Sequence, residues 1–396
     1  MSTEQTPEAR AWPTQRSRQS TVAAQFGADR AELMAWALTT ADPLADAVVE
    51  EIHEHGRTVR IALATGIEHG IAALTDPPAA VAALLTQAES IPDYVDDALL
   101  DQGPLPQYSM PNPVHAISLS AGALVRVYQS PSIATVLATT GRLIDGARRR
   151  IDETGKWVRT ATLPGAMRLG APGYVQTLQV RMLHAHMRRL ARTRGYDEAA
   201  FGAPINQVDL ARTWMDFTVT SYRAEALMGF DLNGSEQHSL YRYWWYVGHV
   251  LGIDPRLIEG IAGNDEAKRV DDLLETVTGP LIPESGVLAK ATIESVVDVL
   301  HEVLSIPPRM GLHAMYALTR RFHGNSLCDE LGLPSAGPAD GVLSAAIRVV
   351  QARRTKLRQN PDAWRRDQLK QIADARAIDA DPSEPTGYQQ EAAVEA

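Results

Sequence analysis

The stretch "RAELMAWALTTADPLADAVVEEIHEHGRTVRIALATGIEHGIAAL" (residues 30–74) decides the fold class, because Ala, Leu and Glu dominate it and only Pro43 interrupts it. The next segment, residues 76–103, has the same character, with Asp76 placed as an N-cap and prolines in the first turn. Both segments are typical of α-helices joined by short turns.

The rest of the chain continues this pattern. Residues 103–115, "GPLPQYSMPNPVH", contain four prolines and are predicted to form a loop. No stretch alternates β-branched and polar residues over several strands. Helical patterns occupy residues 116–160, 173–194, 207–229, 235–251, 265–276, 286–304 and 308–322. We therefore predict an all-α protein, with a single globular helical domain over 25–375 between a disordered lead (1–24) and a disordered tail (376–396).

Composition excludes several classes of function. The 396-residue chain carries a net charge of −10, which argues against nucleic acid as a partner. Its one cysteine, Cys328, excludes an internal disulfide and a cysteine-built metal site, and it fits a cytoplasmic location. We expect no membrane span, because no apolar run approaches the ~18 residues that one requires. The polar N-terminus has no apolar core of a secretion signal.

Cations are concentrated in one region of this acidic chain. From Arg148 to Arg194 there are eleven Lys and Arg residues and two acidic ones. Within this region, Arg181, His184 and Arg188 share a helix face, whereas His186 points about 200° away from His184. A neutral imidazole between two guanidiniums suits a metal whose surrounding ligand carries carboxylates, as haem does. A solvated basic helix face is the alternative.

A second helix face carries Arg150, Glu153 and Thr154, at positions i, i+3 and i+4. Each residue also has a structural explanation for its position. Arg150 could equally form a surface ion pair, Glu153 could be a solvated helix residue, and the Thr154 hydroxyl could bond to the preceding helical turn.

Four blocks, in order, resemble the latex-clearing-protein family, which comprises the bacterial rubber oxygenases and the MpaB-type oxygenase catalytic domain. The resemblance covers roughly residues 110 to 260. The blocks are "TGRLIDGARRRIDETGKWV" (140–158), "VRMLHAHMRRL" (180–190), "GAPINQVDLARTWMDF" (202–217) and "YRYWWYVGHVLGID" (241–254).

This resemblance implies an all-α oxygenase that binds haem b. The family's axial histidine lies in an "R-x-x-H-A-x-x-R" block, which here runs from Arg181 to Arg188 and makes His184 the iron ligand. The two arginines would then bind the haem propionates. The family's distal Arg-x-x-x-Thr pattern matches Arg150 and Thr154. These two side chains would stabilise charge on bound O2 or peroxide and donate a hydrogen bond to it.

Two departures from the family pattern argue against rubber cleavage. A lysine that can cap the iron in rubber-cleaving members is replaced by Glu153, which could move a proton to or from a substrate. The place of a distal carboxylate falls near Ala134. We therefore expect a haem-dependent oxidoreductase of the oxygenase type that acts on a small to medium apolar molecule.

Other interpretations remain open. His238, Arg242, Trp245 and His249 share one face, which is either a second pocket wall, with a possible second haem ligand, or a packed core face. Glu50 to His53 and Asp298 to His301 mimic half-motifs of a di-iron protein. Asp96, Asp97 and Asp101, with 264–272, mimic the Mg²⁺ motifs of a class I terpene cyclase. A non-catalytic haem-binding helical protein is also compatible with the sequence.

Overall fold

The computed structural model describes residues 12–139, 147–335, 337 and 339–380. Helices join one another throughout these residues and no β-strand occurs among them, which confirms the predicted all-α class. The first half contains α1 (Gln19–Phe26), α2 (Ala28–Thr39), α3 (Pro43–His55), α4 (Arg57–His69), η1 (Ile71–Ala73), α5 (Ala79–Glu89), α6 (Asp97–Gln102), η2 (Leu105–Ser109), α7 (Asn112–Ile117), η3 (Ser118–Leu124), α8 (Val125–Val127), α9 (Pro131–Thr139), α10 (Ala147–Ala161) and α11 (Pro172–Thr193).

In the described part of the second half the regular elements are again helices. It contains α12 (Glu198–Phe201), α13 (Gln207–Met215), η4 (Asp216–Thr220), α14 (Ser221–Leu227), α15 (Gly234–Val250), α16 (Pro255–Ile258), α17 (Asn264–Thr278), α18 (Pro283–Leu304), α19 (Pro308–His323), α20 (Asn325–Glu330), α21 (Ala339–Arg358) and α22 (Pro361–Asp379).

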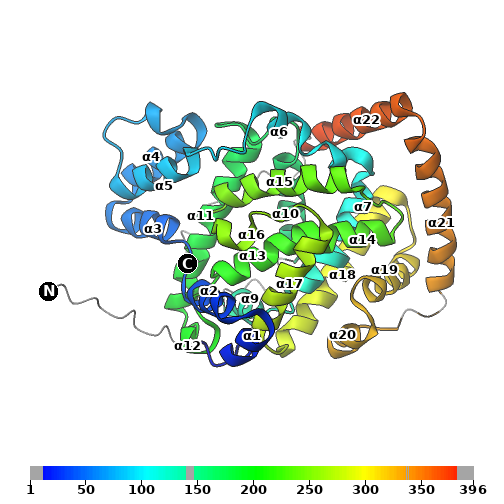
Figure 1. Cartoon of the computed structure of the whole chain (residues 1–396), viewed down its shortest axis with the longest axis horizontal. Coiled ribbons are helices and arrows are strands. Elements are labelled where there is room, and N and C mark those ends of the chain that lie inside the picture. Colours follow the sequence, from blue (N-terminus) through cyan, green and yellow to red (C-terminus); the bar gives the residue numbers. More distant parts are fainter. Residues whose placement is uncertain (1–11, 140–146, 336, 338, 381–396) are drawn as a thin grey trace.

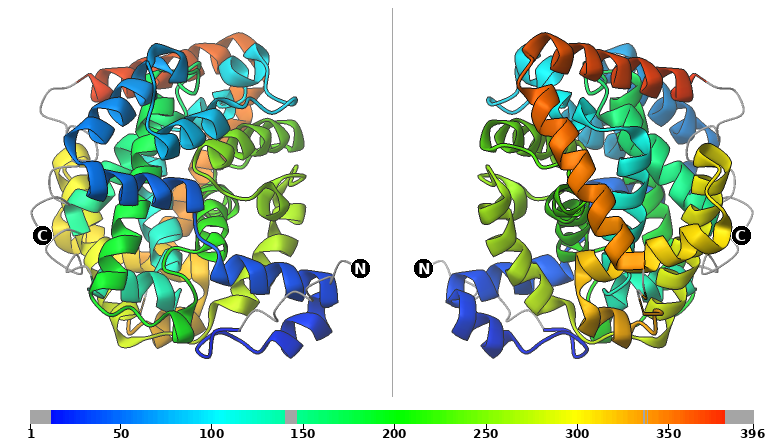
Figure 2. Two further views of the ribbon diagram at one scale, coloured as in Figure 1. Left: turned by 90° about the vertical axis from the view of Figure 1, so that its left-hand side faces the viewer. Right: turned by 90° about the vertical axis from the view of Figure 1, so that its right-hand side faces the viewer.

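The helices surround a central group made of α10, α11, α13 and α15 (Figure 1). At one end of the molecule, α3, α4 and α5 form a lobe, and α21 stands at the opposite end. The views in Figure 2 place α1 and α2 at the bottom and α22 across the top. The main hydrophobic core runs through the central group, and its largest fully buried aromatic side chains are Trp214, Trp244, Tyr174, Tyr241 and Tyr243.

Three boundaries differ from the sequence prediction. The segment predicted as one helix over 116–160 is divided, because the chain turns before Pro131, which begins α9. The proline-rich loop 103–115 contains the 3₁₀ turn η2, whose residues are largely buried. Residues 12–24 are also part of the folded molecule, since Arg16 is 5% exposed and Val22 is fully buried.

Two of the helical segments, η3 and η4, are π-helical turns that pack against each other. The second turn begins at Asp216, which belongs to a buried cluster of charges. Arg126 donates from Nη1 to Asp216 and from Nη2 to Asp271, each at 2.7 Å. Burial raises the pKa of Asp216 to about 6 and lowers the pKa of the neighbouring Arg212 to about 10. These charges lie behind the wall that α13 and η4 present to the cavity described next.

Candidate cofactor and substrate cavity

A cavity with a volume of about 220 Å³ lies between α9, α10, α11, α13, η4 and α15. This is far more than the ~10–15 Å³ that one water molecule needs. Its walls are mainly aliphatic and aromatic. The polar or charged lining side chains are few: Tyr128, Glu153, Thr154, Trp157, His184, Asp209, Thr213, Trp214 and Trp244. An apolar cavity with few polar groups is the usual form of a site for an organic ligand.

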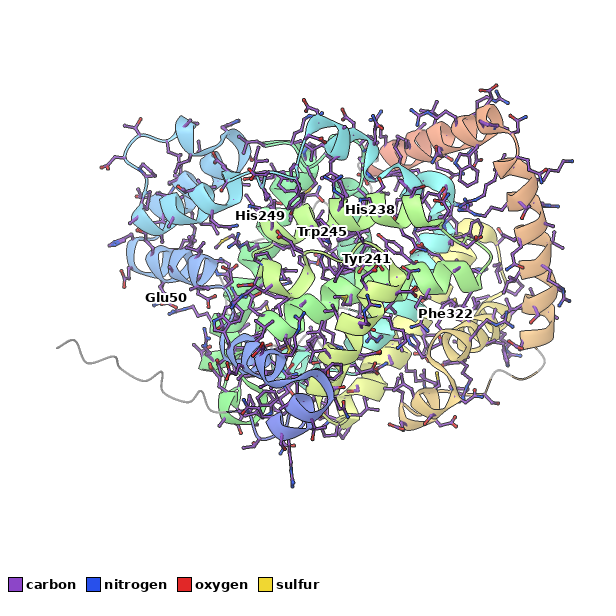
Figure 3. The ribbon with its side chains drawn as sticks, in the orientation of Figure 1. Glu50, His238, Tyr241, Trp245, His249 and Phe322 are labelled. Atoms are coloured by element: carbon purple, nitrogen blue, oxygen red, sulfur yellow. The ribbon has the colours of Figure 1, made fainter. Side chains whose placement is uncertain are left out.

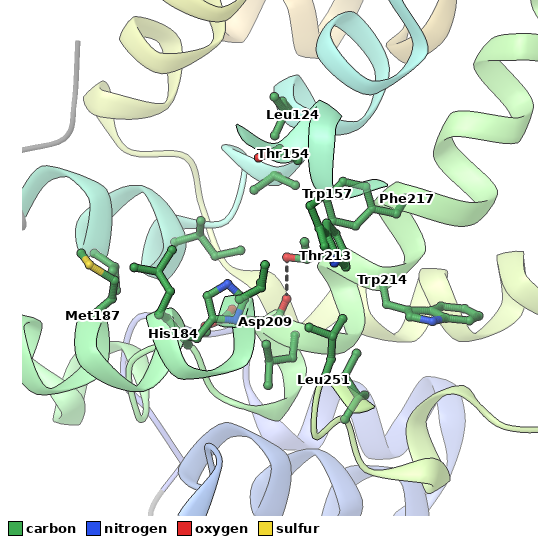
Figure 4. Close-up of a pocket in the computed structure, with 18 of the residues that line it drawn as sticks. Leu124, Thr154, Trp157, His184, Met187, Asp209, Thr213, Trp214, Phe217 and Leu251 are labelled. Carbon is green, nitrogen blue, oxygen red and sulfur yellow. Dashed lines mark hydrogen bonds between the residues drawn. The ribbon is translucent and has the colours of Figure 1, made fainter. Parts of the chain in front are cut away.

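His184 projects from α11 into this cavity (Figure 4). Burial, and to a lesser degree the guanidinium of Arg188, lower the pKa of His184 from its ordinary value of 6.5 to about 4. Its ring is therefore neutral at physiological pH. The Nδ1 atom is buried and has no hydrogen-bond partner in the protein. A neutral imidazole with an unpartnered nitrogen has the chemical state that a metal ligand requires.

The second histidine of the pair, His186, does not line the cavity. Its pKa is lowered by burial and by the charges of Arg60, on α4, and Arg189. The two histidines of "MLHAHMRRL" thus have different surroundings, as the spacing on a helix predicts.

Neither of the arginines that flank His184 lines the cavity. Arg181 is buried, donates to both carboxylate oxygens of Asp42 at 2.6 and 3.1 Å, and also bonds Gln87 and the Val250 carbonyl. Arg188 donates from Nε to Asp46 at 2.6 Å, but its Nη2 atom is buried without a partner. The first guanidinium is thus engaged by the protein, whereas the second retains an unused donor.

Helix α10 brings Glu153, Thr154 and Trp157 to the same cavity, so its predicted face does meet the face of His184. Figure 4 shows Thr154 and Trp157 around the same space as His184. The carboxylate of Glu153 is 6% exposed and accepts a bond from Arg149 Nε at 2.6 Å. Arg150 belongs to α10, but its side chain lies outside the part of the chain that the structure describes.

The aromatic wall of the cavity is absent from the predicted set of site residues. Trp157 meets Phe217 edge to face, with ring centroids 5.4 Å apart, and Phe217 stacks on Trp244 at 6.1 Å. Trp214 donates from Nε1 to the Trp244 carbonyl at 2.8 Å, which ties α13 to α15. The sequence blocks 202–217 and 241–254 contain all but one of these rings, so the pattern indicated the segments without identifying the side chains.

The predicted polar face of α15 lies away from the cavity. Figure 3 shows His238, Trp245 and His249 along this helix, and none of them lines the cavity. Arg242 donates to the Tyr94 carbonyl at 2.9 Å, and the His249 carbonyl accepts a bond from Gln87 at 3.3 Å. This face of α15 therefore packs against neighbouring segments. Trp244, the residue before Trp245, faces the cavity instead.

The alternative metal motifs are not assembled into sites. Among the described residues, no group of three or more His, Cys, Asp or Glu is placed to hold a metal ion. Glu50 pairs with Arg189, and Asp96 caps α6 by accepting from the Leu99 N–H. Asp97 and Asp101 both pair with Arg168 on the surface. These carboxylates have structural partners in place of a shared cation.

A second, smaller cavity of about 80 Å³ adjoins α7 and another face of α10. His115 lines it and bonds from both ring nitrogens: Nδ1 lies 2.8 Å from Oε1 of Glu225, and Nε2 lies 2.9 Å from the Gln107 carbonyl. The carboxylate of Glu225 is 1% exposed and also accepts from Ser118 at 3.0 Å. This histidine is therefore held by protein groups on both sides of its ring.

A sequence model of the catalytic domain described as "ER-bound oxygenase mpaB/B'/Rubber oxygenase" matches residues 113–352, which is more than half of the chain. A search of curated proteins finds no match. Among solved structures, the chain is similar to the latex clearing protein LCP in its closed state, with a TM-score of 0.65 and 19% identity, covering 84% of this chain and 91% of that chain. At this identity the similarity shows the fold alone. Among the described residues, no helix has the length and hydropathy needed to cross a bilayer.

Proposed function

Since the chain belongs to the family of MpaB and rubber-oxygenase catalytic domains, we propose that it is a haem b-dependent oxygenase acting on a small to medium apolar organic molecule rather than on rubber. One observation supports this proposal above the others. The imidazole of His184 is neutral, faces an apolar cavity and has a buried nitrogen with no protein partner.

The residues around His184 fit an iron porphyrin. A flat, largely apolar macrocycle matches aliphatic and aromatic walls, and an imidazole nitrogen matches its iron. The unpartnered Nη2 of Arg188 is a donor suited to a carboxylate at the edge of the macrocycle. Arg181 would have to release Asp42 to take the same role. We therefore propose His184 as the iron ligand and Arg188 as the first partner for a propionate.

When bound, haem would supply the activation of O2 or of a peroxide. The chain's own contribution on the distal side would come from α10. The Thr154 hydroxyl can donate a hydrogen bond into the cavity, and the Glu153 carboxylate, oriented by Arg149, can hold or release a proton there. Arg150 keeps its predicted role of stabilising negative charge. The apolar walls would exclude water, which strengthens these interactions.

The aromatic wall is further evidence for the proposal that the substrate is apolar. Trp157, Phe217 and Trp244 line the cavity, with no charged group among them. Glu153 stands where rubber-cleaving members of the family can have a lysine, and a buried Ala134, not a carboxylate, stands on α9. These differences support a substrate other than rubber.

Titration with haem tests the proposal directly. The purified protein should bind one equivalent and develop a Soret absorption band. His184→Ala should abolish stoichiometric binding, because the iron loses its protein ligand, whereas His186→Ala should bind as the parent does. Equal haem content in the two variants would refute the assignment of His184. A colourless protein that retains iron would favour a di-iron centre instead.

A further inference from the structure

The N-terminal segment, residues 12–18, lies outside the matched domain yet reaches a wall of the cavity. Backbone N–H groups of Thr14 and Gln15 donate to the carbonyls of Ala199 and Ala200, at 3.0 and 2.9 Å. Its contact with Gly279 is so close that a Cβ there would lie 2.3 Å from the Gln15 carbonyl oxygen. The segment is therefore docked against α12 and the end of α17.

Arg16 is the residue of this segment that enters the interior, and its side chain has no solvent exposure. It donates from Nε to the Phe201 carbonyl at 3.0 Å and from Nη1 to the Thr278 carbonyl at 3.3 Å. Its Nη2 donates to both carboxylate oxygens of Asp209, at 3.1 and 3.3 Å. One guanidinium thus connects α12, α13 and α17.

Asp209 belongs to α13 and lines the cavity, and its carboxylate is 2% exposed. Besides Arg16, it accepts from Ser132 Oγ at 2.7 Å to each oxygen and from Ser130 Oγ at 3.3 Å. Ser132 is the second residue of α9, so the negative charge also lies near the positive end of that helix dipole.

Helix α9 in turn supplies Ile133, Val136 and Leu137 to the cavity. The carboxylate of Asp209 is therefore the point where the α9 wall is fastened to the α13 wall. The loss of hydration of a carboxylate this deeply buried has to be offset by a paired cation and hydrogen bonds. That cation comes from the N-terminal segment.

We propose that Arg16 is a positioning residue of the cavity: by holding the Asp209 carboxylate, it keeps α9 against α13 and fixes the shape of the wall that these two helices form. The N-terminal segment is then a functional extension of the matched domain. This inference concerns the cavity itself and rests on the proposed function only for the identity of what the cavity binds.

Hydrogen exchange in α9 tests the inference without added haem, so its outcome is independent of whether His184 binds iron. Arg16→Met should speed amide exchange of α9 at least tenfold, while α15, which packs mainly on α6, α11, α16 and η2, keeps its parental rate. The matched control is Arg18→Met, which removes an exposed charge two residues away and should leave both helices unchanged.

The double variant Arg16→Met/Asp209→Asn separates this role from simple loss of packing. It removes both charges and retains an amide that Ser132 can bond, so α9 exchange should return toward the parental rate. Arg16→Lys keeps a charge but not the fork of donors and should give an intermediate rate, and it replaces Arg16→Met as the test if that variant does not fold. Equal acceleration in α9 and α15, or unchanged exchange in α9, would overturn the proposal.

Discussion

The two cavities each contain a histidine, and the surroundings of these two rings are opposite. His115, in the small cavity, has protein groups within hydrogen-bond distance of both nitrogens, including the buried carboxylate of Glu225. His184, in the large cavity, faces aliphatic and aromatic walls and has a buried nitrogen that nothing bonds. His115 belongs to α7 and His184 to α11, and residues of α10 line both cavities.

The difference separates a histidine that is held by protein groups from one that is available to bind a ligand. The Nε2 atom of His115 donates to the Gln107 carbonyl, since a carbonyl oxygen can only accept, and Nδ1 lies within hydrogen-bond distance of Oε1 of Glu225 and of Nε2 of Gln107. Both nitrogens of the His115 ring therefore have protein partners, although Oε2 of Glu225 is buried without one. Burying His184 unpaired instead costs free energy that the protein alone does not recover, which is expected where a ligand completes the site.

The largest predicted contrast concerns stability. His115→Leu removes the partner of a carboxylate that is 1% exposed, so it should lower the free energy of unfolding by ~3–5 kcal/mol. His184→Leu removes an unsatisfied polar atom and should change it by less than ~1 kcal/mol or raise it. Urea unfolding of both variants without added haem measures these values. Equal losses would show that the two rings have the same structural role.

The second prediction concerns pH. Because the pKa of His184 is about 4 in the folded protein and 6.5 ordinarily, the unfolded chain binds a proton in this interval that the folded chain does not. Stability should therefore fall as the pH drops from 6.5 toward 4, by up to ~3 kcal/mol from this group. His184→Leu should lose this contribution in denaturation curves between pH 7 and 4. If His184→Leu and the parent protein showed the same pH dependence of stability, burial would not be holding the His184 ring in its neutral form.

The smallest predicted effect concerns the pKa values of the two histidines, each of which is lowered by a different one of two neighbouring arginines. Arg188→Met should raise the pKa of His184 part of the way from about 4 toward 6.5, because one repelling charge is removed. Arg189→Met should instead raise the pKa of His186 and leave His184 unchanged. NMR titration of the imidazole protons measures both. A reversed pattern would place the His184 ring on the other face of α11.

Much of this architecture could be predicted from the sequence because helical signals are local. Spacing on α11 separated His184 from His186, and spacing on α10 placed Glu153 and Thr154 on one face, which the structure brings to the cavity. The same spacing put Arg181 beside His184, but it could not reveal that Asp42, 139 residues earlier, engages that guanidinium. A helix face can be calculated from sequence, whereas a partner on another helix cannot.

The residues that sequence reasoning missed all depend on such distant contacts. Asp209 lines the cavity through its place on α13, and its partners Arg16 and Ser132 lie 193 and 77 residues away. The N-terminal segment was predicted to be disordered because its composition is polar, but backbone bonds to Ala199 and Ala200 and the buried partners of Arg16, which composition does not encode, hold it against the domain. Aromatic side chains likewise became a wall only when α10, η4 and α15 met.

The paired π-helical turns, η3 and η4, have a consequence for the tolerance of this fold to length changes. Each turn accommodates one more residue than an α-helical turn would, so everything after it is rotated by about 100° relative to an unbroken helix. Deleting one residue from η4 would convert the π-helical turn into a regular α-helical turn. Phe217, or the residues that follow it, would then be rotated away from Trp157. The shape of the cavity therefore depends on the number of residues in these turns as well as on their side chains. Insertion or deletion of a single residue here would change that shape more than most substitutions would.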